Sequence, residues 1–179
     1  MKKGLMIGLM GAMTLVACNQ EKEKVEDQFN YTVEQFADLQ LLRFKVHGFE
    51  ELPLKQKELV YYLSEAALQG RDILFDQNGK YNLIIRKMLE VVYTDYQGDR
   101  SDANFKNFET YLKCVWFSNG IHHHYAADKF VPGFTPEFFK SALESVDASK
   151  LPLMEGETLD ALCEEVFPVI FDAKVMAKR

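Results

Sequence analysis

Three consecutive histidines, His122, His123 and His124, are the first candidates for chemistry in this chain, because imidazole is a common metal ligand. Their spacing argues against a metal site. Neighbouring side chains of an extended segment point to opposite sides, so one ion would easily reach only the outer two histidines. Zinc sites usually take their ligands from separated positions, and the chain has no H-E-x-x-H motif. We therefore predict hydrogen-bonding histidines in a loop, with no metal ligand and no catalytic residue in this chain.

A cysteine nucleophile is the second possibility. Cys114 precedes the histidines, but its neighbours Leu112 and Val115 place it on an apolar helical face rather than in an electropositive, exposed setting. Cys163 also lies on an apolar face. We expect both to be buried free thiols, although an exported compartment would permit a disulfide between them. No G-x-S-x-G, P-loop or G-x-G-x-x-G motif is present.

The residues from Trp116 to Tyr125 concentrate aromatic and polar side chains around the histidines. Such a mixture is typical of binding clefts. It is equally compatible with ordinary packing at the end of a helix. The residue types alone leave both interpretations open.

The elements that would position this loop are mostly helices. Apolar side chains at helical spacing predict helices over residues 81–96 and from Ser101 or Asp102 to Asn119-Gly120, a pair that often ends helices. A loop over residues 121–134 follows. Thr135-Pro136 and Thr158 then begin two further helices, the second disturbed near its end by Pro168.

In the N-terminal half, the sequence pattern indicates the secondary structure less directly. Thr32-Val-Glu-Gln35 matches a capping box and predicts a short helix, and the alternation of residues 42–46 predicts a strand before a turn at Gly48. An amphipathic helix is expected from Pro53 to Leu74. Gly70 would lie in its interior, where a close contact with another backbone would explain it. The expected fold class is mainly α, with one or two short strands.

The first 17 residues have the pattern of an export signal. Lys2 and Lys3 precede an apolar run from Leu5 to Val16, which is shorter than the roughly 20 apolar residues that span a bilayer. The run ends in Leu-Val-Ala-Cys18, which looks like a lipobox, so we expect lipidation of Cys18 and anchoring in the bacterial cell envelope, at the periplasmic or the outer-membrane face. Residues 18–29 are polar and charged, as in a flexible tether.

Composition limits the partners of residues 30–179, which we take as one domain. Removing the signal takes away two lysines, so the net charge of −6 becomes about −8. A surface that contacts phosphates needs an excess of lysine and arginine, so a general nucleic-acid-binding role is excluded. With 47% hydrophobic and 13% aromatic residues, the chain can bury a substantial core.

A family resemblance enters at the loop. The stretch Trp116-Phe-Ser-Asn-Gly-Ile-His-His-His-Tyr-Ala-Ala-Asp-Lys-Phe-Val-Pro132 resembles the dipeptidyl peptidase III family, particularly its Bacteroides-type members. Residues 63–74 and 81–89 resemble the helices before this loop in that family, and residues 167–172 resemble a later segment. The resemblance covers nearly all of the mature chain, with its segments in the same order.

The resemblance implies the helical N-terminal part of a two-lobed zinc exopeptidase, which removes dipeptides from peptide N-termini. The family's zinc motif, H-E-x-x-G-H or H-E-x-x-x-H, is not found here and would lie downstream of this chain. Zinc is then expected in the full-length enzyme and not in this chain, which alone should be inactive. The resemblance places Tyr125 in the substrate subsite, with Asn119 and His124 flanking the same cleft, unless Tyr125 merely packs on Trp116 or Phe130.

One alternative belongs to a different class of protein. The chain would then be a self-contained, non-catalytic helical lipoprotein that binds peptides or an envelope partner. Its ending at Arg179, directly after an apolar helix, favours an incomplete piece of a longer enzyme.

Overall fold

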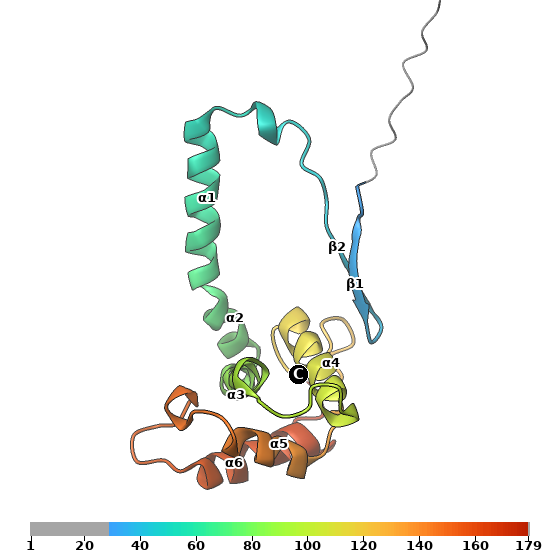
Figure 1. Ribbon diagram of the computed structural model, residues 1–179, viewed down its shortest axis with the longest axis vertical. Coiled ribbons are helices and arrows are strands. Elements are labelled where there is room, and N and C mark those ends of the chain that lie inside the picture. The colour runs from blue at the N-terminus through green and yellow to red at the C-terminus, as the bar shows by residue number, and fades with distance from the viewer. Residues whose placement is uncertain (1–28, 179) are drawn as a thin grey trace, which may run out of the picture. The chain divides into compact units, whose positions relative to one another are not determined.

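The computed structural model describes residues 29–178. By its internal contacts the chain divides into residues 1–30 and residues 31–179, and the following account concerns the second unit. This unit is mainly helical with one small antiparallel sheet of two strands, which confirms the expected fold class (Figure 1). The predicted signal and the lipidation site Cys18 lie outside the described residues.

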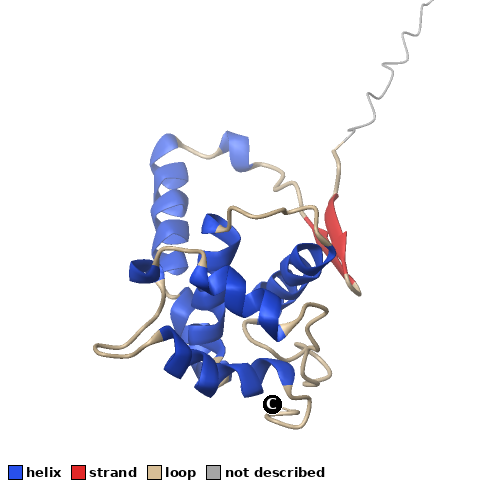
Figure 2. Ribbon diagram, turned by 60° about the horizontal axis from the view of Figure 1, so that its bottom comes forward, coloured by secondary structure: helices blue, strands red, loops and turns tan. Residues whose placement is uncertain are grey.

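The sheet is a hairpin of β1 (Thr32–Phe36) and β2 (Leu39–Leu42), which turns through Ala37 and Asp38 (Figure 2). The predicted helix at residues 32–35 is therefore wrong. The hydroxyl of Thr32 does not cap a helix but accepts a hydrogen bond of 3.1 Å from Gln40 across the hairpin. The predicted strand at 42–46 is also misplaced, because the second strand ends at Leu42.

A left-handed Gly48 (φ 84°) and a short 3-10 helix, η1 (Phe49–Glu51), lead into α1 (Leu54–Gln69). The chain then begins α2 (Arg71–Asn78) after Gly70, so the single helix predicted as far as Leu74 is in fact two helices. Gly70 makes no close approach to another backbone. A Cβ atom there would meet only the carbonyl oxygen of Ala67, at an ordinary 3.5 Å.

Helix α1 has no buried residue, which corrects the expectation of an amphipathic helix. Its apolar side chains surround the helix axis instead of forming one stripe, and several are more than half exposed. Helix α2 does contact the core, through the fully buried ring of Phe75. The exposed apolar residues of α1 include Leu54, Leu59, Tyr61, Tyr62, Leu63 and Leu68.

The core is built by α3 (Asn82–Asp95), α4 (Ala103–Ser118), α5 (Pro136–Glu144) and α6 (Leu159–Phe171), with a short 3-10 helix, η2 (Ala148–Lys150), between the last two. The predicted starts of the last three α-helices are confirmed. Asp102, Thr135 and Thr158 each accept a hydrogen bond from a backbone N–H in the first turn. These caps satisfy donors that have no partner within the helix.

Aromatic rings fill the centre of this core. The ring of Phe108 is fully buried and lies 5.6 Å from both Phe105 and Phe134, measured between ring centroids. Phe139 follows at 6.0 Å. Cys114 and Cys163 are buried and free, as predicted.

Candidate functional site

The loop with the three histidines begins at a fixed point. Helix α4 ends at Asn119 in the left-handed conformation (φ 52°), as the Asn-Gly pair predicted. The next residue, Gly120 (φ 154°), lies so close to Asn82 that a Cβ atom would meet its amide nitrogen at 2.4 Å. The amide oxygen of Asn82 accepts the N–H of Ile121 (3.2 Å). Only glycine fits between the two helices here.

His122 is a structural residue of the loop. It is 2% exposed, and its Nε2 lies 2.7 Å from the carbonyl oxygen of Met176. Since a carbonyl can only accept, Nε2 donates this bond. The loop also pairs with itself and with the segment after α6, because Phe130 N–H bonds the carbonyl of Ile121 (2.8 Å) and Lys129 N–H bonds that of Ala177 (3.2 Å).

Lys129 holds the same segment with its side chain. Its ammonium donates to the carbonyls of Asp172 (2.6 Å) and Val175 (3.0 Å), just beyond the C-terminal end of α6. Burial lowers the pKa of Lys129, although the charge of Asp172 opposes the shift. The interpretation of the histidine region as a hydrogen-bonding loop is thus supported by its contacts.

His124 and Tyr125 form a short stack of rings at the surface. The ring of His124 lies 5.0 Å from Phe117 and 4.2 Å from Tyr125. Tyr125 is 88% exposed. Its other ring contact is with His123, so the alternative that it packs on Trp116 or Phe130 is wrong.

Asn119, the third residue expected in the cleft, has a different environment. Its carbonyl oxygen accepts a hydrogen bond from the side chain of Asn78 (3.1 Å), which ties the end of α4 to the end of α2. The contacts of the described residues bring His124 and Tyr125 together, and none of them includes Asn119. Asn119 therefore acts as a helix cap in this structure.

A hollow of about 270 Å³ lies beside the ring stack, between the hairpin and α4. Phe117 lines the hollow and also contacts His124. Sequence reasoning missed the hairpin side of this hollow, because the register of β1 and β2 was not predicted. The hollow is lined by Glu34, Phe36, Leu41, Lys113, Trp116 and Phe117.

The charged groups of the hollow are paired. Lys113 lies 2.6 Å from Glu34 on the hairpin and 3.0 Å from Glu109 on its own helix. Burial acts to lower the pKa of Lys113, but hydrogen bonds to these two carboxylates raise it above its usual value. The ion pair between Lys113 and Glu34 also joins the hairpin to α4, so it links the two walls of the hollow.

Cys114 lies on the same helix but is no candidate nucleophile. Burial raises the pKa of its thiol, and the negative charge of Asp38 raises it further. Because the thiolate is the reactive form, such a thiol is a weaker nucleophile at neutral pH than an ordinary cysteine.

The residues described do not fit a zinc ion. Within residues 29–178, no three His, Cys, Asp or Glu side chains are placed to hold a metal. His122 and His123 are already engaged with backbone groups of the loop and of the segment after α6. The same stretch of chain contains no helix long and apolar enough to cross a bilayer.

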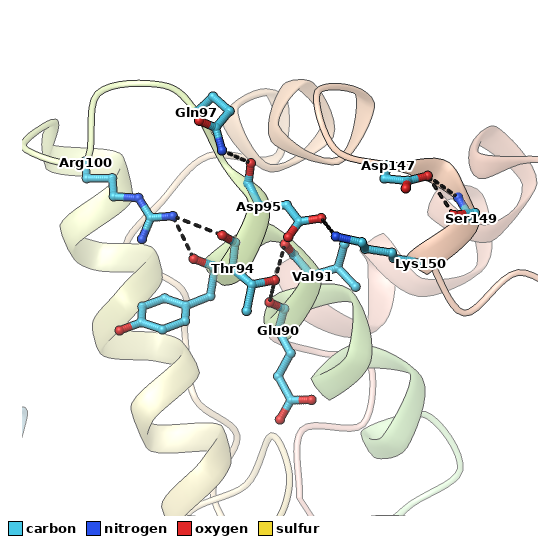
Figure 3. A network of polar contacts seen from close by, with 10 residues as sticks. Glu90, Val91, Thr94, Asp95, Gln97, Arg100, Asp147, Ser149 and Lys150 are labelled. Atoms are coloured by element: carbon cyan, nitrogen blue, oxygen red, sulfur yellow. Dashed lines mark hydrogen bonds and ion pairs between the residues drawn. The ribbon is translucent and has the colours of Figure 1, made fainter.

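A second hollow lies where α3 ends, near η2. Figure 3 shows the polar contacts around this end of the helix. Asp95 and Lys150 form an ion pair of 2.6 Å that joins the two elements. The guanidinium of Arg100 donates to the carbonyl of Tyr93 (2.9 Å) near the end of the same helix. These contacts hold the C-terminal end of α3 in place, so we assign no catalytic or binding role to this hollow.

In comparisons with known proteins, the chain matches no family model and no curated protein.

Proposed function

We propose that this chain is the N-terminal part of a zinc-dependent dipeptidyl peptidase of the dipeptidyl peptidase III type. The proposal rests on the resemblance of several separated segments to that family, Trp116–Pro132 among them, and on where this segment lies. Two helices and the segment after α6 hold the loop, and its Tyr125 ring is presented to solvent beside His124. A ring held in this way can bind a peptide.

In the proposed enzyme this chain binds the substrate and does not break the bond. The exposed ring of Tyr125 offers a flat apolar surface and a hydroxyl to the first residues of a peptide. The adjacent ring of His124 fixes the orientation of the Tyr125 ring. The hollow beside Phe117 accepts an apolar side chain of the same peptide. In this proposal zinc and the residues that activate water belong to a downstream part of the protein, as the resemblance to the family implies.

The exposed apolar surface of α1 supports a longer protein. Large exposed apolar side chains that lie together normally mark a surface that binds another polypeptide. Leu54, Tyr62 and Leu63 are 69%, 67% and 60% exposed, and Ile73 on α2 is 59% exposed. Further polypeptide that packs around α1 would remove these side chains from water.

The alternative is a self-contained helical lipoprotein without catalysis. The closed aromatic core around Phe108 favours a piece that folds alone, and α1 would then contact a peptide or an envelope partner. Sequencing the gene beyond the codon for Arg179 separates the two proposals. The peptidase proposal requires the reading frame to continue through H-E-x-x-G-H or H-E-x-x-x-H, and a stop codon directly after Arg179 refutes it.

The enzymatic test uses the full-length protein and a chromogenic dipeptide amide. We expect turnover that a chelator abolishes, and Tyr125→Ala should lower kcat/KM about tenfold, which corresponds to about 1.4 kcal/mol of lost binding. Met154→Ala is the matched control, since Met154 is also well exposed (75%) but lies outside the loop. Equal kinetics of the two variants would contradict the role of Tyr125. Chelator-sensitive turnover by residues 1–179 alone would contradict the absence of catalytic residues.

The envelope location is tested separately through Cys18. A lipid on this residue should keep the protein in the membrane fraction, and Cys18→Ala should release it to the soluble fraction. Retention of the variant in membranes would refute the lipobox assignment without affecting the peptidase proposal.

A further inference from the structure

His123 lies at the centre of the tight turn that presents Tyr125. Its Nδ1 accepts hydrogen bonds from the backbone N–H groups of Tyr125 (3.2 Å) and Ala126 (3.1 Å). The backbone of His123 also pairs with Ala127 (3.0 Å) and Asp128 (2.8 Å), and Ala127 adopts a left-handed conformation (φ 57°). The imidazole thus caps the turn in the way that an Asn or Asp side chain caps an Asx turn.

This geometry fixes the protonation state of the ring. A nitrogen that accepts two hydrogen bonds carries no proton, so the proton of the neutral imidazole is on Nε2. Nε2 lies 3.5 Å from a carboxylate oxygen of Asp38 at the tip of the hairpin. A second proton has to be added at Nδ1, where it converts the acceptor of the Tyr125 and Ala126 N–H groups into a donor. Protonation therefore breaks both bonds to the backbone.

The charged groups around His123 favour a new interaction that replaces the two hydrogen bonds lost on protonation. Asp38 faces Nε2 from the hairpin, and an imidazolium would form a full ion pair with it. Asp128 on the returning arm of the loop is already paired with Lys178 (3.2 Å), and Lys129 is bound to carbonyls beyond α6. Two further neighbours that titrate are the ring of His124, at 4.5 Å, and the phenol ring of Tyr125, at 6.3 Å.

There is also space for the ring to move. A hollow of about 330 Å³ lies on this side of the loop and includes His123, Asp38, Ala126 and Asp128 among its lining residues. The side chain of His123 is 20% exposed and that of Asp38 is 71% exposed, so water and protons reach both. The ring can shift toward Asp38 without displacing core residues.

We propose that His123 is a pH-sensitive switch of the turn that carries Tyr125. The neutral ring caps the turn and holds Tyr125 in place. The charged ring releases the N–H groups of Tyr125 and Ala126 and pairs with Asp38, so the turn opens on acidification. Histidine is the side chain that ordinarily changes its charge between pH 8 and pH 5. The switch concerns the conformation of the loop and does not depend on the peptidase proposal.

The test is an NMR titration of the ¹⁵N-labelled full chain from pH 8 to pH 5. At pH 8 we expect the Nε2–H tautomer of His123 and slow hydrogen exchange of the Tyr125 and Ala126 amides. On acidification both amides should lose protection at least tenfold, with the midpoint at which the His123 ring titrates. Asp38→Asn removes the counter-charge and should move that midpoint to lower pH.

His123→Asn is the matched control. The asparagine Oδ1 can accept the same N–H groups but does not titrate, so this variant should keep both amides protected at pH 5. His124→Gln should retain the full transition. The proposal is overturned if Nδ1 of His123 is protonated at pH 8, if His123→Asn shows the same transition as the wild type, or if only His124→Gln abolishes it. The tautomer measurement needs only the wild-type chain, so it decides even where a variant does not fold.

Discussion

Arg86 on α3 connects three helices, and its replacement should cost more stability than that of any exposed lysine nearby. Its guanidinium donates a hydrogen bond of 2.6 Å to Asp72 on α2 and lies 4.6 Å from the ring centroid of Phe75 on the same helix. Its Nε is 3.4 Å from Glu90, close enough for an ion pair but not aligned for a hydrogen bond. Glu90 in turn accepts the indole N–H of Trp116 on α4 (2.8 Å).

The size of the effect follows from the surroundings of each contact. A hydrogen bond between charged groups contributes about 1.5–3 kcal/mol when buried. The Asp72 side chain is 49% exposed, so we reduce this to about 1 kcal/mol. The guanidinium side chain is only 11% exposed and lies over a fully buried ring, which adds about 1–2 kcal/mol. Arg86→Met should therefore lower the free energy of unfolding by about 2–3 kcal/mol.

The assay is urea unfolding at neutral pH, followed by circular dichroism and by the fluorescence of Trp116, the only tryptophan of the chain. Lys87→Met is the matched control. Lys87 lies 3.6 Å from the other oxygen of Asp72 and is 43% exposed, so its removal should cost under about 0.5 kcal/mol. The reasoning is refuted if the two variants lose equal stability, or if Arg86→Met loses less than about 1 kcal/mol.

Three further predictions concern the aromatic core, the loss of stability at acidic pH and the two buried thiols. Phe108→Ala should cost about 3–5 kcal/mol in urea unfolding because it empties the aromatic core, whereas Phe44→Ala, at a ring that is 74% exposed, should cost less than about 1 kcal/mol. The Arg86 hydrogen bond lowers the pKa of Asp72 below its usual 3.8. The stabilisation from this hydrogen bond is fully present above pH 3.8 and is lost as the pH falls through the lower pKa that Asp72 has in the folded state. Asp72→Asn should therefore flatten the decline of the urea midpoint below pH 4. Burial raises the pKa of the Cys114 and Cys163 thiols, so peptide mass spectrometry should detect alkylation of both only after unfolding, and fast labelling of the native chain would contradict this.

The helix starts at Asp102, Thr135 and Thr158 were predictable because each cap bonds a donor two or three residues along the chain. The same signal failed at Thr32. Its hydroxyl is bonded to Gln40 in the next strand, a contact set by the register of the hairpin. Short-range sequence patterns therefore identify caps correctly only where no partner from a distant segment competes for the capping side chain.

The candidate site also has one part that the sequence predicted and one part that it did not. The loop and its starting point could be read from Asn119 and Gly120, and the exposed Tyr125 lies in the predicted segment. The hollow beside it could not be predicted, because Phe36 and Leu41 reach it only through the pairing of the hairpin. The burial of His122 also depends on a bond to a residue 54 positions later.

The bonds between the histidine loop and the segment after α6 also determine when the loop can fold. The ribosome adds about 5–20 residues per second, so Asp172, Val175 and Met176 follow the loop by roughly 2–10 s. Until then Lys129 and His122 lack the carbonyls that they bind in the finished chain. The loop can therefore form these hydrogen bonds only after the segment that follows α6 has been synthesised.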